Sequence, residues 1–238
     1  LLIKKENDIT IFDNFSNSKE ESVMYLKNLG AKIVKGDIRK IGEINNAIKD
    51  HDIVIHLAAK ISVEESIKSP SETFQTNVEG TKNVLIACEK NQIKKIIVAS
   101  SAAVYGESEA DVKLTEKSKI NPISPYGESK VMMENEIKKI TENNDMNYVI
   151  LRFFNIYGKS QSPEYAGVIT KFIKKIEMNQ SLEIFGDGMQ TRDFISINDV
   201  VNSIFYSIKN GENQTYNIAS GNPITIKYLA ELMISLYK

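Results

Sequence analysis

Short apolar runs alternate with longer stretches of mixed hydrophobic and polar positions up to about residue 155. The runs are rich in Ile, Val and other strand-forming residues and predict β-strands at Ile9–Phe12, Lys32–Lys35, Ile53–His56, Ile96–Ala99 and Tyr148–Leu151. The stretches between them predict helices at Lys19–Leu29, Ile41–Lys49, Glu72–Asn91 and Pro125–Asn143. Strands that alternate with helices in this way predict an α/β fold with a doubly wound parallel sheet.

This regular alternation loosens after about residue 155. Glycines and a proline punctuate shorter elements there, at Gly158, Pro163, Gly186, Gly188 and Gly211. We therefore expect a larger domain over residues 1–155 and a smaller part over residues 156–238 that packs on it.

The composition indicates a soluble globular protein that can bury a substantial core. The 238 residues are 42% hydrophobic and 26% charged, with 30 basic against 31 acidic residues. No segment concentrates Lys or Arg enough to predict a nucleic-acid or membrane surface, and no apolar run reaches about 18 residues. Cys88, the only cysteine, lies in an apolar helical pattern, which excludes an internal disulfide and favours the reducing cytoplasm. With only His51 and His56 as histidines, no metal site is expected.

A serine, a tyrosine and a lysine form the clearest chemical pattern. Ser101 follows a predicted strand, at the end where open α/β sheets place their ligands. Ser124 is typical of a helix N-cap and Pro125 of the first helical position, so Tyr126 and Lys130 should lie one turn apart on one helix face. A tyrosine, with a pKa near ~10, is a base at neutral pH only if its phenolate is stabilised, and the Lys130 ammonium is placed to lower that pKa. We predict that Ser101 hydrogen-bonds a substrate oxygen whose proton Tyr126 takes. On its own, Tyr-x-x-x-Lys also fits an ordinary exposed helix face.

Acidic residues after two strands fit a dinucleotide site. In a dinucleotide-binding fold a carboxylate after the second strand binds the adenosine ribose, about 20 residues after a glycine-rich turn. Asp13 has this place and favours NAD over NADP, and Asp37 after the next strand has a carboxylate for the adenine amino group. The glycine-rich turn is absent, because residues 1–5 resemble the end of the helix that follows it. We expect the first strand to be missing too, which would leave open strand edges at the centre of the sheet. Asp13 equally fits a simple polar turn after a strand.

Two further segments fit a cofactor nearby. After the strand that ends at His56, the residues Leu57, Ala58 and Ala59 would let a cofactor approach the backbone. Asn77 lies inside a predicted helix, where Asn is mildly unfavourable, so we expect a buried structural role or a contact near the cofactor. His56 itself is expected to be a core residue with its polar atoms satisfied.

These motifs resemble those of the extended short-chain dehydrogenase/reductases, specifically the NAD-dependent sugar-nucleotide epimerase/dehydratase family, and within it UDP-glucose 4-epimerases. The resemblance extends over essentially the whole sequence. It rests on ordered segments at residues 13–18, 36–39, 56–59, 77–81, 100–106, 126–130, 152–158 and 186–194. It implies a Rossmann-type NAD-binding domain at 1–155, without its first strand and glycine-rich loop, and a mainly substrate-binding region at 156–238, incomplete at its C-terminal end.

The resemblance also implies roles for individual residues. Ser101, Tyr126 and Lys130 would be catalytic. The implied NAD-binding residues are Asp13, Asn14, Asn17, Ser18, Asp37, Ile38, Leu57, Ala58, Ala59, Asn77, Tyr126, Lys130 and Phe154. The implied substrate-binding residues are Ser101, Tyr126, Asn155, Phe185 and Arg192.

In the substrate set, Asn155 would touch the nucleotide diphosphate, Arg192 would pair with its phosphates and Phe185 would pack against the uracil. Purely structural roles also fit these three residues. Arg192 would then pair with Asp187 or Asp193, Asn155 would cap a turn, and Phe185 would belong to the core.

The implied reaction is NAD-dependent epimerisation at C4 of a UDP-hexose through a 4-keto intermediate. Dehydratases and decarboxylases of this family usually carry an acidic residue just after the catalytic Ser or Thr, whereas Ala102 and Ala103 stand here. This departure favours epimerisation or simple oxidation and reduction. Another nucleotide-sugar epimerase, a 4-keto-sugar reductase and an inactive truncated fragment are the alternatives. The resemblance further implies a homodimer, formed through helices that include residues 72–91 and 125–143.

Overall fold

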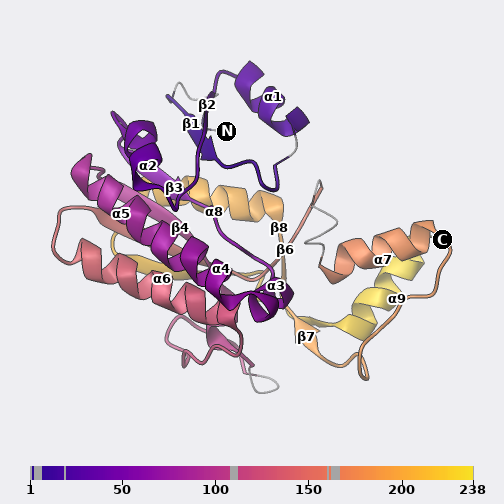
Figure 1. The fold of residues 1–238 in the computed structure, drawn as a ribbon. Coiled ribbons are helices and arrows are strands. Elements are labelled where there is room, and N and C mark those ends of the chain that lie inside the picture. Colours follow the sequence, from indigo (N-terminus) through magenta and orange to yellow (C-terminus); the bar gives the residue numbers. More distant parts are fainter. Residues whose placement is uncertain are drawn as a thin grey trace.

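The computed structural model describes residues 2, 7–18, 20–107, 112–159, 161 and 167–237. Its largest sheet has four parallel strands in the order β3–β4–β5–β9 (Figure 1). These strands are β3 (Ile53–His56), β4 (Lys95–Ser101), β5 (Asn147–Phe153) and β9 (Gln214–Ile218). A separate parallel pair joins β1 (Thr10–Asp13) to β2 (Lys32–Lys35). The α/β fold with a parallel sheet is confirmed, and each predicted strand is present.

Helices cover both faces of the main sheet because its central strands are apolar on both sides. On one face lie α2 (Ile41–Ile48), α5 (Gly80–Lys90) and α6 (Pro125–Thr141), and on the other lies α8 (Ile197–Lys209) (Figure 1). Along β4, Ile96 and Val98 belong to the core under α5 and α6, and Ile97 to the core with α8. This alternation is the period of two expected of a strand, and it produces the doubly wound arrangement. Cys88 is fully buried in the first of these cores, as expected of a small apolar residue.

The predicted helix at 72–91 is interrupted. It begins as α4 (Pro70–Phe74), passes through one π-helical turn at Gln75–Glu79 and continues as α5. Two more helices lie earlier in the chain, α1 (Glu20–Asn28) between β1 and β2 and α3 (Val63–Lys68) after β3. Such π turns occur mostly as single insertions in longer helices and often near functional sites. Here the turn carries Asn77.

The later part of the chain forms a smaller unit that stands beside the sheet (Figure 1). Helices α7 (Val168–Glu177) and α9 (Ile226–Leu236) pack together around Phe172, Leu229 and Met233. Two short strand pairs accompany them, β6 (Asn155–Tyr157) with β8 (Phe194–Ser196) and β7 (Thr191–Arg192) with β10 (Ile224–Thr225). The division at residue 155 stays a prediction, since α8 and β9 lie after this boundary yet pack in the main sheet.

Two features of the whole fold bear on the sequence expectations. Among the described residues, β1 and β3 are not paired, so each has an unpaired edge. Within the same residues, no helix has both the length and the apolar character needed to cross a membrane.

Candidate active site

The structure brings Ser101, Tyr126 and Lys130 together at the end of β4. A hydrogen bond joins the Ser101 side chain to the Tyr126 hydroxyl, and Lys130 Nζ lies 5.9 Å from the centre of the Tyr126 ring. The N-cap prediction is confirmed, because Ser124 Oγ accepts a hydrogen bond from the Gly127 amide (3.1 Å) and Pro125 follows. The spacing within α6 and the position of the strand end therefore produce the expected cluster.

Close packing between the strand end and the helix start maintains this arrangement. A short 3-10 helix, η3 (Ala102–Tyr105), follows β4 directly. A Cβ at Gly127 would lie only 2.6 Å from the carbonyl oxygen of Ala103, so only glycine allows this approach. Ser101 Oγ also accepts from the Ala103 amide (3.1 Å), which orients the hydroxyl.

Lys130 is almost completely buried but has few acceptors. Among the described residues its Nζ donates to one oxygen, the Ala99 carbonyl (2.8 Å), and lies 4.0 Å from Met133 Sδ. Burial lowers the pKa of Lys130 to about 8, and the charge of Glu134 opposes this change. An ammonium has three donors, so N–H groups remain for a ligand that carries hydroxyl groups.

The expected lowering of the Tyr126 pKa is not found. Burial raises the pKa of this phenol, and only the hydrogen bond from Ser101 acts in the opposite direction. The reason is that removing water disfavours the phenolate more than this contact favours it. Without a further positive charge nearby, Tyr126 is a neutral phenol.

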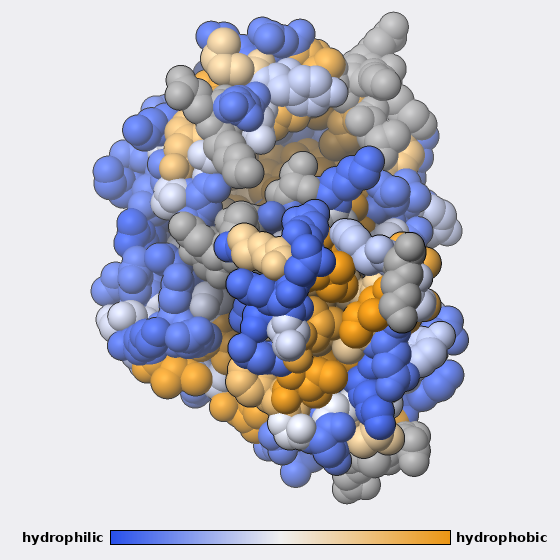
Figure 2. Space-filling model, turned by 90° about the vertical axis from the view of Figure 1, so that its right-hand side faces the viewer, coloured by the Kyte–Doolittle hydropathy of each residue, from blue (hydrophilic) through white to orange (hydrophobic). Residues whose placement is uncertain are grey.

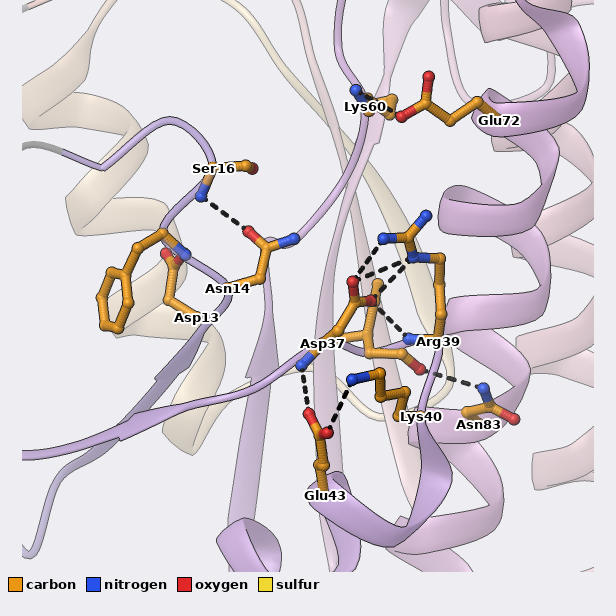
Figure 3. A network of polar contacts seen from close by, with 12 residues as sticks. Asp13, Asn14, Ser16, Asp37, Arg39, Lys40, Glu43, Lys60, Glu72 and Asn83 are labelled. Atoms are coloured by element: carbon orange, nitrogen blue, oxygen red, sulfur yellow. Dashed lines mark hydrogen bonds and ion pairs between the residues drawn. The ribbon is translucent and has the colours of Figure 1, made fainter.

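Asp13 and Asn14 lie in a tight turn after β1. The Asp13 carboxylate accepts from the Phe15 amide (2.6 Å) and from the Ser18 hydroxyl (3.0 Å). The Asn14 side chain accepts from the Ser16 amide (3.0 Å) (Figure 3). It also contributes to the lowered pKa of Asp37 through a side-chain hydrogen bond. The turn is thus polar, and it still places Asp13, Asn14 and Ser18 together. Asn17 is exposed in the same turn.

Asp37 is held by Arg39, a residue that the sequence reasoning missed. Arg39 Nε and Nη2 contact both carboxylate oxygens, the shortest contact being 2.6 Å (Figure 3). This guanidinium keeps the pKa of Asp37 low, at about 2. The Asp-x-Arg spacing directly after a strand is the sequence feature that could have predicted this ion pair.

Ile38 faces the core rather than a cofactor. Its side chain is buried against Gly80, where an added Cβ would lie 2.6 Å from Ile38 Cδ1, and its carbonyl accepts from Asn83 (3.1 Å). Any contact of Ile38 with a ligand therefore falls to its backbone amide.

Asn77 fastens the loop after β3 to helix α6. It is 1% exposed, and its side chain makes a reciprocal pair of hydrogen bonds with the Lys60 amide (2.8 Å) and carbonyl (2.9 Å) and donates to Ser129 (3.0 Å). Its role is the buried structural one, close to both Lys130 and the loop. In that loop Leu57 is 54% exposed, and Ala58 and Ala59 follow it.

His56 is a satisfied core residue, as predicted. Thr81 Oγ1 donates to the Asn77 carbonyl (2.7 Å), so it accepts from His56 Nε2 (2.9 Å), and the neutral ring carries its proton there. Burial lowers the pKa of His56 to about 3.

A cavity of about 410 Å³ lies within the smaller unit, with walls from β6, α7, β7 and β8, and Asn155, Phe185 and Arg192 all line it. Phe185 is 83% exposed, so its assignment to the core is excluded. Residues of α7 and α9 contribute to its lining, and on the face that carries these helices apolar side chains gather among hydrophilic ones (Figure 2). Phe154 precedes β6 and donates its amide to the Ile218 carbonyl (3.1 Å).

Neither predicted partner of Arg192 holds it. The Asp193 carboxylate accepts instead from Ser220 and the Gly221 amide, and Asp187 accepts from the Met189 amide. Among the described residues Arg192 has no ion pair and donates only to the adjacent Thr191 carbonyl (2.8 Å). Its guanidinium is thus available to an anion.

The Asp193 carbonyl accepts from the Asn155 amide (3.1 Å) and from its side chain (2.8 Å), so Asn155 caps this segment. Two lysines of α7 also line the cavity and were missed, Lys171 and Lys175, the second paired with Glu183 (2.7 Å). Their side chains add positive charge near Arg192.

Comparisons with known proteins agree with this fold and site. A family model described as "NAD dependent epimerase/dehydratase family" matches residues 1–219. A putative UDP-glucose 4-epimerase from Methanocaldococcus jannaschii is 39% identical over 98% of this chain and 75% of that protein. The UDP-glucose 4-epimerase of Thermotoga maritima, solved with UDP-glucose, has a TM-score of 0.92 and 30% identity, covering 99% of this chain and 76% of the other. A UDP-N-acetylglucosamine 4-epimerase from Methanobrevibacter ruminantium has a TM-score of 0.89 and 37% identity, covering 98% and 75%.

Proposed function

This chain belongs to the NAD dependent epimerase/dehydratase family, and from that premise we propose that it interconverts the C4 epimers of a UDP-hexose, UDP-glucose and UDP-galactose, through a 4-keto intermediate. One observation carries the proposal. The Ser101–Tyr126 hydrogen bond lies beside the buried Lys130, and two alanines rather than an acid follow Ser101.

NAD is the cofactor of this family, and the residues present fit it. A bound NAD would supply the hydride transfer from and back to the sugar C4. Lys130 supports the fit most directly, because a buried ammonium with donors to spare suits the hydroxyls of the nicotinamide ribose. The turn after β1 and the loop after β3 would supply the remaining contacts. We assign these to Asp13, Asn14, Asn17, Ser18, Asp37, the Ile38 amide, Leu57, Ala58, Ala59 and Phe154, with Asn77 as a support for the loop.

Proton transfer falls to Tyr126. Its phenolate takes the proton of the sugar 4-hydroxyl and gives it back after the ketone has turned over, while Ser101 hydrogen-bonds the same oxygen. Since burial raises the pKa of Tyr126 here, the base form needs the positive charges of Lys130 and of the oxidised nicotinamide close by.

Nucleotide recognition falls to the cavity. Arg192 is available to pair with the diphosphate, and Lys171 adds positive charge to the same lining. Asn155 lies beside them, and the exposed ring of Phe185 is placed to pack against uracil. Binding would bury this ring, which explains why such a large apolar side chain faces solvent.

Dehydration and decarboxylation are the main competing reactions in this family. Both need acid–base groups beyond the Tyr and Ser pair, and the residues directly after Ser101 are Ala102 and Ala103 in η3. Their methyl groups cannot transfer protons, which favours epimerisation. An N-acetylated UDP-hexose is the second candidate substrate, supported by the 37% identity to the UDP-N-acetylglucosamine 4-epimerase.

The test is to incubate the purified protein with UDP-glucose, with and without added NAD, and to follow UDP-galactose by NMR. We expect the 4-epimer to appear, and Tyr126→Phe to reduce kcat by about a thousandfold or more because it removes the base. Tyr206→Phe is the matched control, since Tyr206 is 68% exposed on α8.

Parallel reactions contain UDP-N-acetylglucosamine, UDP-glucuronic acid and dTDP-glucose. If the protein epimerises UDP-N-acetylglucosamine but not UDP-glucose, the proposed substrate changes to the N-acetylated UDP-hexose. A 4-keto-6-deoxy product, or no conversion of any sugar with NAD present, would overturn the 4-epimerase assignment.

We also propose that the protein is a homodimer that pairs through α5 and α6. The two helices contact one another and lie side by side on one face (Figure 1). Each helix has an exposed large apolar side chain, Ile86 at 45% and Met132 at 40%. A second copy of the same face is the surface that would cover both.

A further inference from the structure

We propose that Glu134 is a positioning residue for the Ser101–Tyr126–Lys130 cluster, which it supports by clamping the end of β4 to helix α6 and by providing the counter-charge for Lys130. This inference rests on the proposed roles of the three cluster residues. Glu134 itself contacts neither Tyr126 nor Ser101, so its action is exerted through its neighbours.

The contacts of Glu134 are buried and complete. The residue is 3% exposed and follows Lys130 by one turn of α6. Its Oε1 accepts from the Ser100 hydroxyl (2.5 Å) and from Arg152 Nε (2.9 Å), and its Oε2 accepts from Arg152 Nη2 (2.6 Å). Two-point pairing of a guanidinium with a carboxylate is strong and fixes orientation.

Three consecutive residues of β4 are thereby attached to three turns of α6. The Ala99 carbonyl accepts from Lys130, Ser100 donates to Glu134, and Ser101 hydrogen-bonds Tyr126. The helix residues are spaced four apart, so they face the strand end in a row. Ser100 is therefore the middle link, and Glu134 is the only one of the three helix partners without a proposed contact to substrate or cofactor.

Arg152 anchors this clamp to the other side of the sheet end. The guanidinium is 4% exposed, and its Nη1 donates to the Tyr105 hydroxyl (2.8 Å), which donates to Asn217 Oδ1 (2.6 Å). Through this chain β4, β5, η3 and β9 are linked to α6. Fully satisfied buried networks of this kind hold one geometry, whereas partly satisfied ones do not.

Charge gives Glu134 its second effect. Lys130 and Arg152 are both buried cations, and Glu134 pairs with Arg152 while its charge also acts on Lys130. Its charge raises the pKa of Lys130 against the effect of burial. The other groups that face this pair are Tyr126 on α6, Tyr105 on η3, Tyr148 on β5 and the neutral His56 on β3. None of them supplies a negative charge at neutral pH, so removing the charge of Glu134 leaves two buried cations uncompensated.

Two variants separate the clamp from the charge. Ser100→Ala removes the link to Glu134 but keeps every charge, and we expect kcat to fall about tenfold to a hundredfold with a smaller change in KM. Glu134→Gln keeps the shape but removes the charge, so the pKa of Lys130 falls and the alkaline limb of the kcat profile moves to lower pH. Glu134→Gln alone leaves the buried Arg152 guanidinium without its carboxylate and can prevent folding. The double variant Glu134→Gln, Arg152→Gln removes that guanidinium as well, so it tests the loss of the Glu134 charge in a protein that folds. Glu136→Gln is the control, a partly exposed carboxylate on the same helix that pairs with Lys82.

A second readout uses the protein without substrate or added cofactor. The pKa of Lys130 is about 8 in the folded state against 10.5 for the free side chain, so the unfolded state binds more protons between these values and stability rises with pH there. The free energy of unfolding is measured by urea titration across this pH range. In Glu134→Gln its increase with pH should begin at a lower pH than in the wild type, and in Lys130→Met the increase due to Lys130 should be absent.

These experiments test the positioning role of Glu134 separately from the proposed function. An unchanged kcat in Ser100→Ala, or a Glu134→Gln protein whose kcat profile and urea profile both match the wild type, would overturn the positioning role. If the wild type converts no nucleotide sugar, the proposed function fails, and the urea profiles still show whether Glu134 acts on Lys130. If Glu134→Gln does not fold, Ser100→Ala and the double variant give the decision.

Discussion

At the scale of single residues, burial decides protonation more than sequence neighbours do. Tyr126, Lys130 and His56 lie in the interior, and in each case removing water disfavours the charged form. Tyr126 therefore has a raised pKa and the other two have lowered ones. Asp37 is the opposite case, because it is near the surface and Arg39 stabilises its charge.

His56 should make the protein sensitive to acid. Its pKa is about 3 when folded against 6.5 for the free side chain, so the unfolded state binds the extra proton between these values. Stability should then fall as the pH drops from about 6.5 towards 3. His56→Gln should be less stable at pH 7 but lose less on acidification, as measured by urea titration at several pH values. If His51→Gln and His56→Gln lost the same amount of stability on acidification, this prediction would be wrong.

At the scale of elements, the interrupted helix from α4 to α5 shows how local and tertiary forces compete. A continuous helix was predicted for Glu72–Asn91, and the π turn at Gln75–Glu79 inserts a residue into it. This insertion accompanies an Asn77 side chain that meets both the backbone at Lys60 and the Ser129 hydroxyl. The three hydrogen bonds outweigh the small preference for a regular helix.

Replacing Asn77 by alanine should destabilise the fold. The change removes two partly buried hydrogen bonds to the Lys60 backbone and a buried one to Ser129, so we expect a loss of about 2–4 kcal/mol in the free energy of unfolding. Urea titration measures it. Asn83→Ala, which removes a single hydrogen bond to the Ile38 carbonyl, should lose only about 1 kcal/mol. Equal losses in the two variants would refute the structural role given to Asn77.

At the scale of the whole molecule, the sheet and the smaller unit are connected through a few residues. Asp193, which is buried beside Arg192, holds the turn at Ser220–Gly221 with its carboxylate and Asn155 with its carbonyl. The cavity lies against this connection.

The homodimer proposal belongs to the same scale. Met132→Glu places a charge on the exposed apolar surface of α6, and it should shift a dimer to monomers because burying an unpaired carboxylate is unfavourable. Sedimentation velocity at several protein concentrations measures the change. Met178→Glu is the control, since Met178 is 55% exposed at the end of α7, away from this face. A wild-type protein that sediments as a monomer at all concentrations would exclude the dimer.

The sequence by itself determined what depends on neighbours along the chain. Alternating runs predicted the strands, Ser124 and Pro125 marked the start of α6, and the four-residue spacing placed Tyr126 and Lys130 on one face. Backbone periodicity and capping are local properties, so a sequence shows them directly.

Only the tertiary structure decided the contacts between distant segments. It joined Ser100 and Arg152 to Glu134, brought Asn14 to Asp37, added β9 to the sheet and lined the cavity with Arg192 and Lys171. It also raised the pKa of Tyr126, contrary to expectation. The physical reason is that burial and the distance between charges depend on how the elements pack, and spacing along a chain does not determine either.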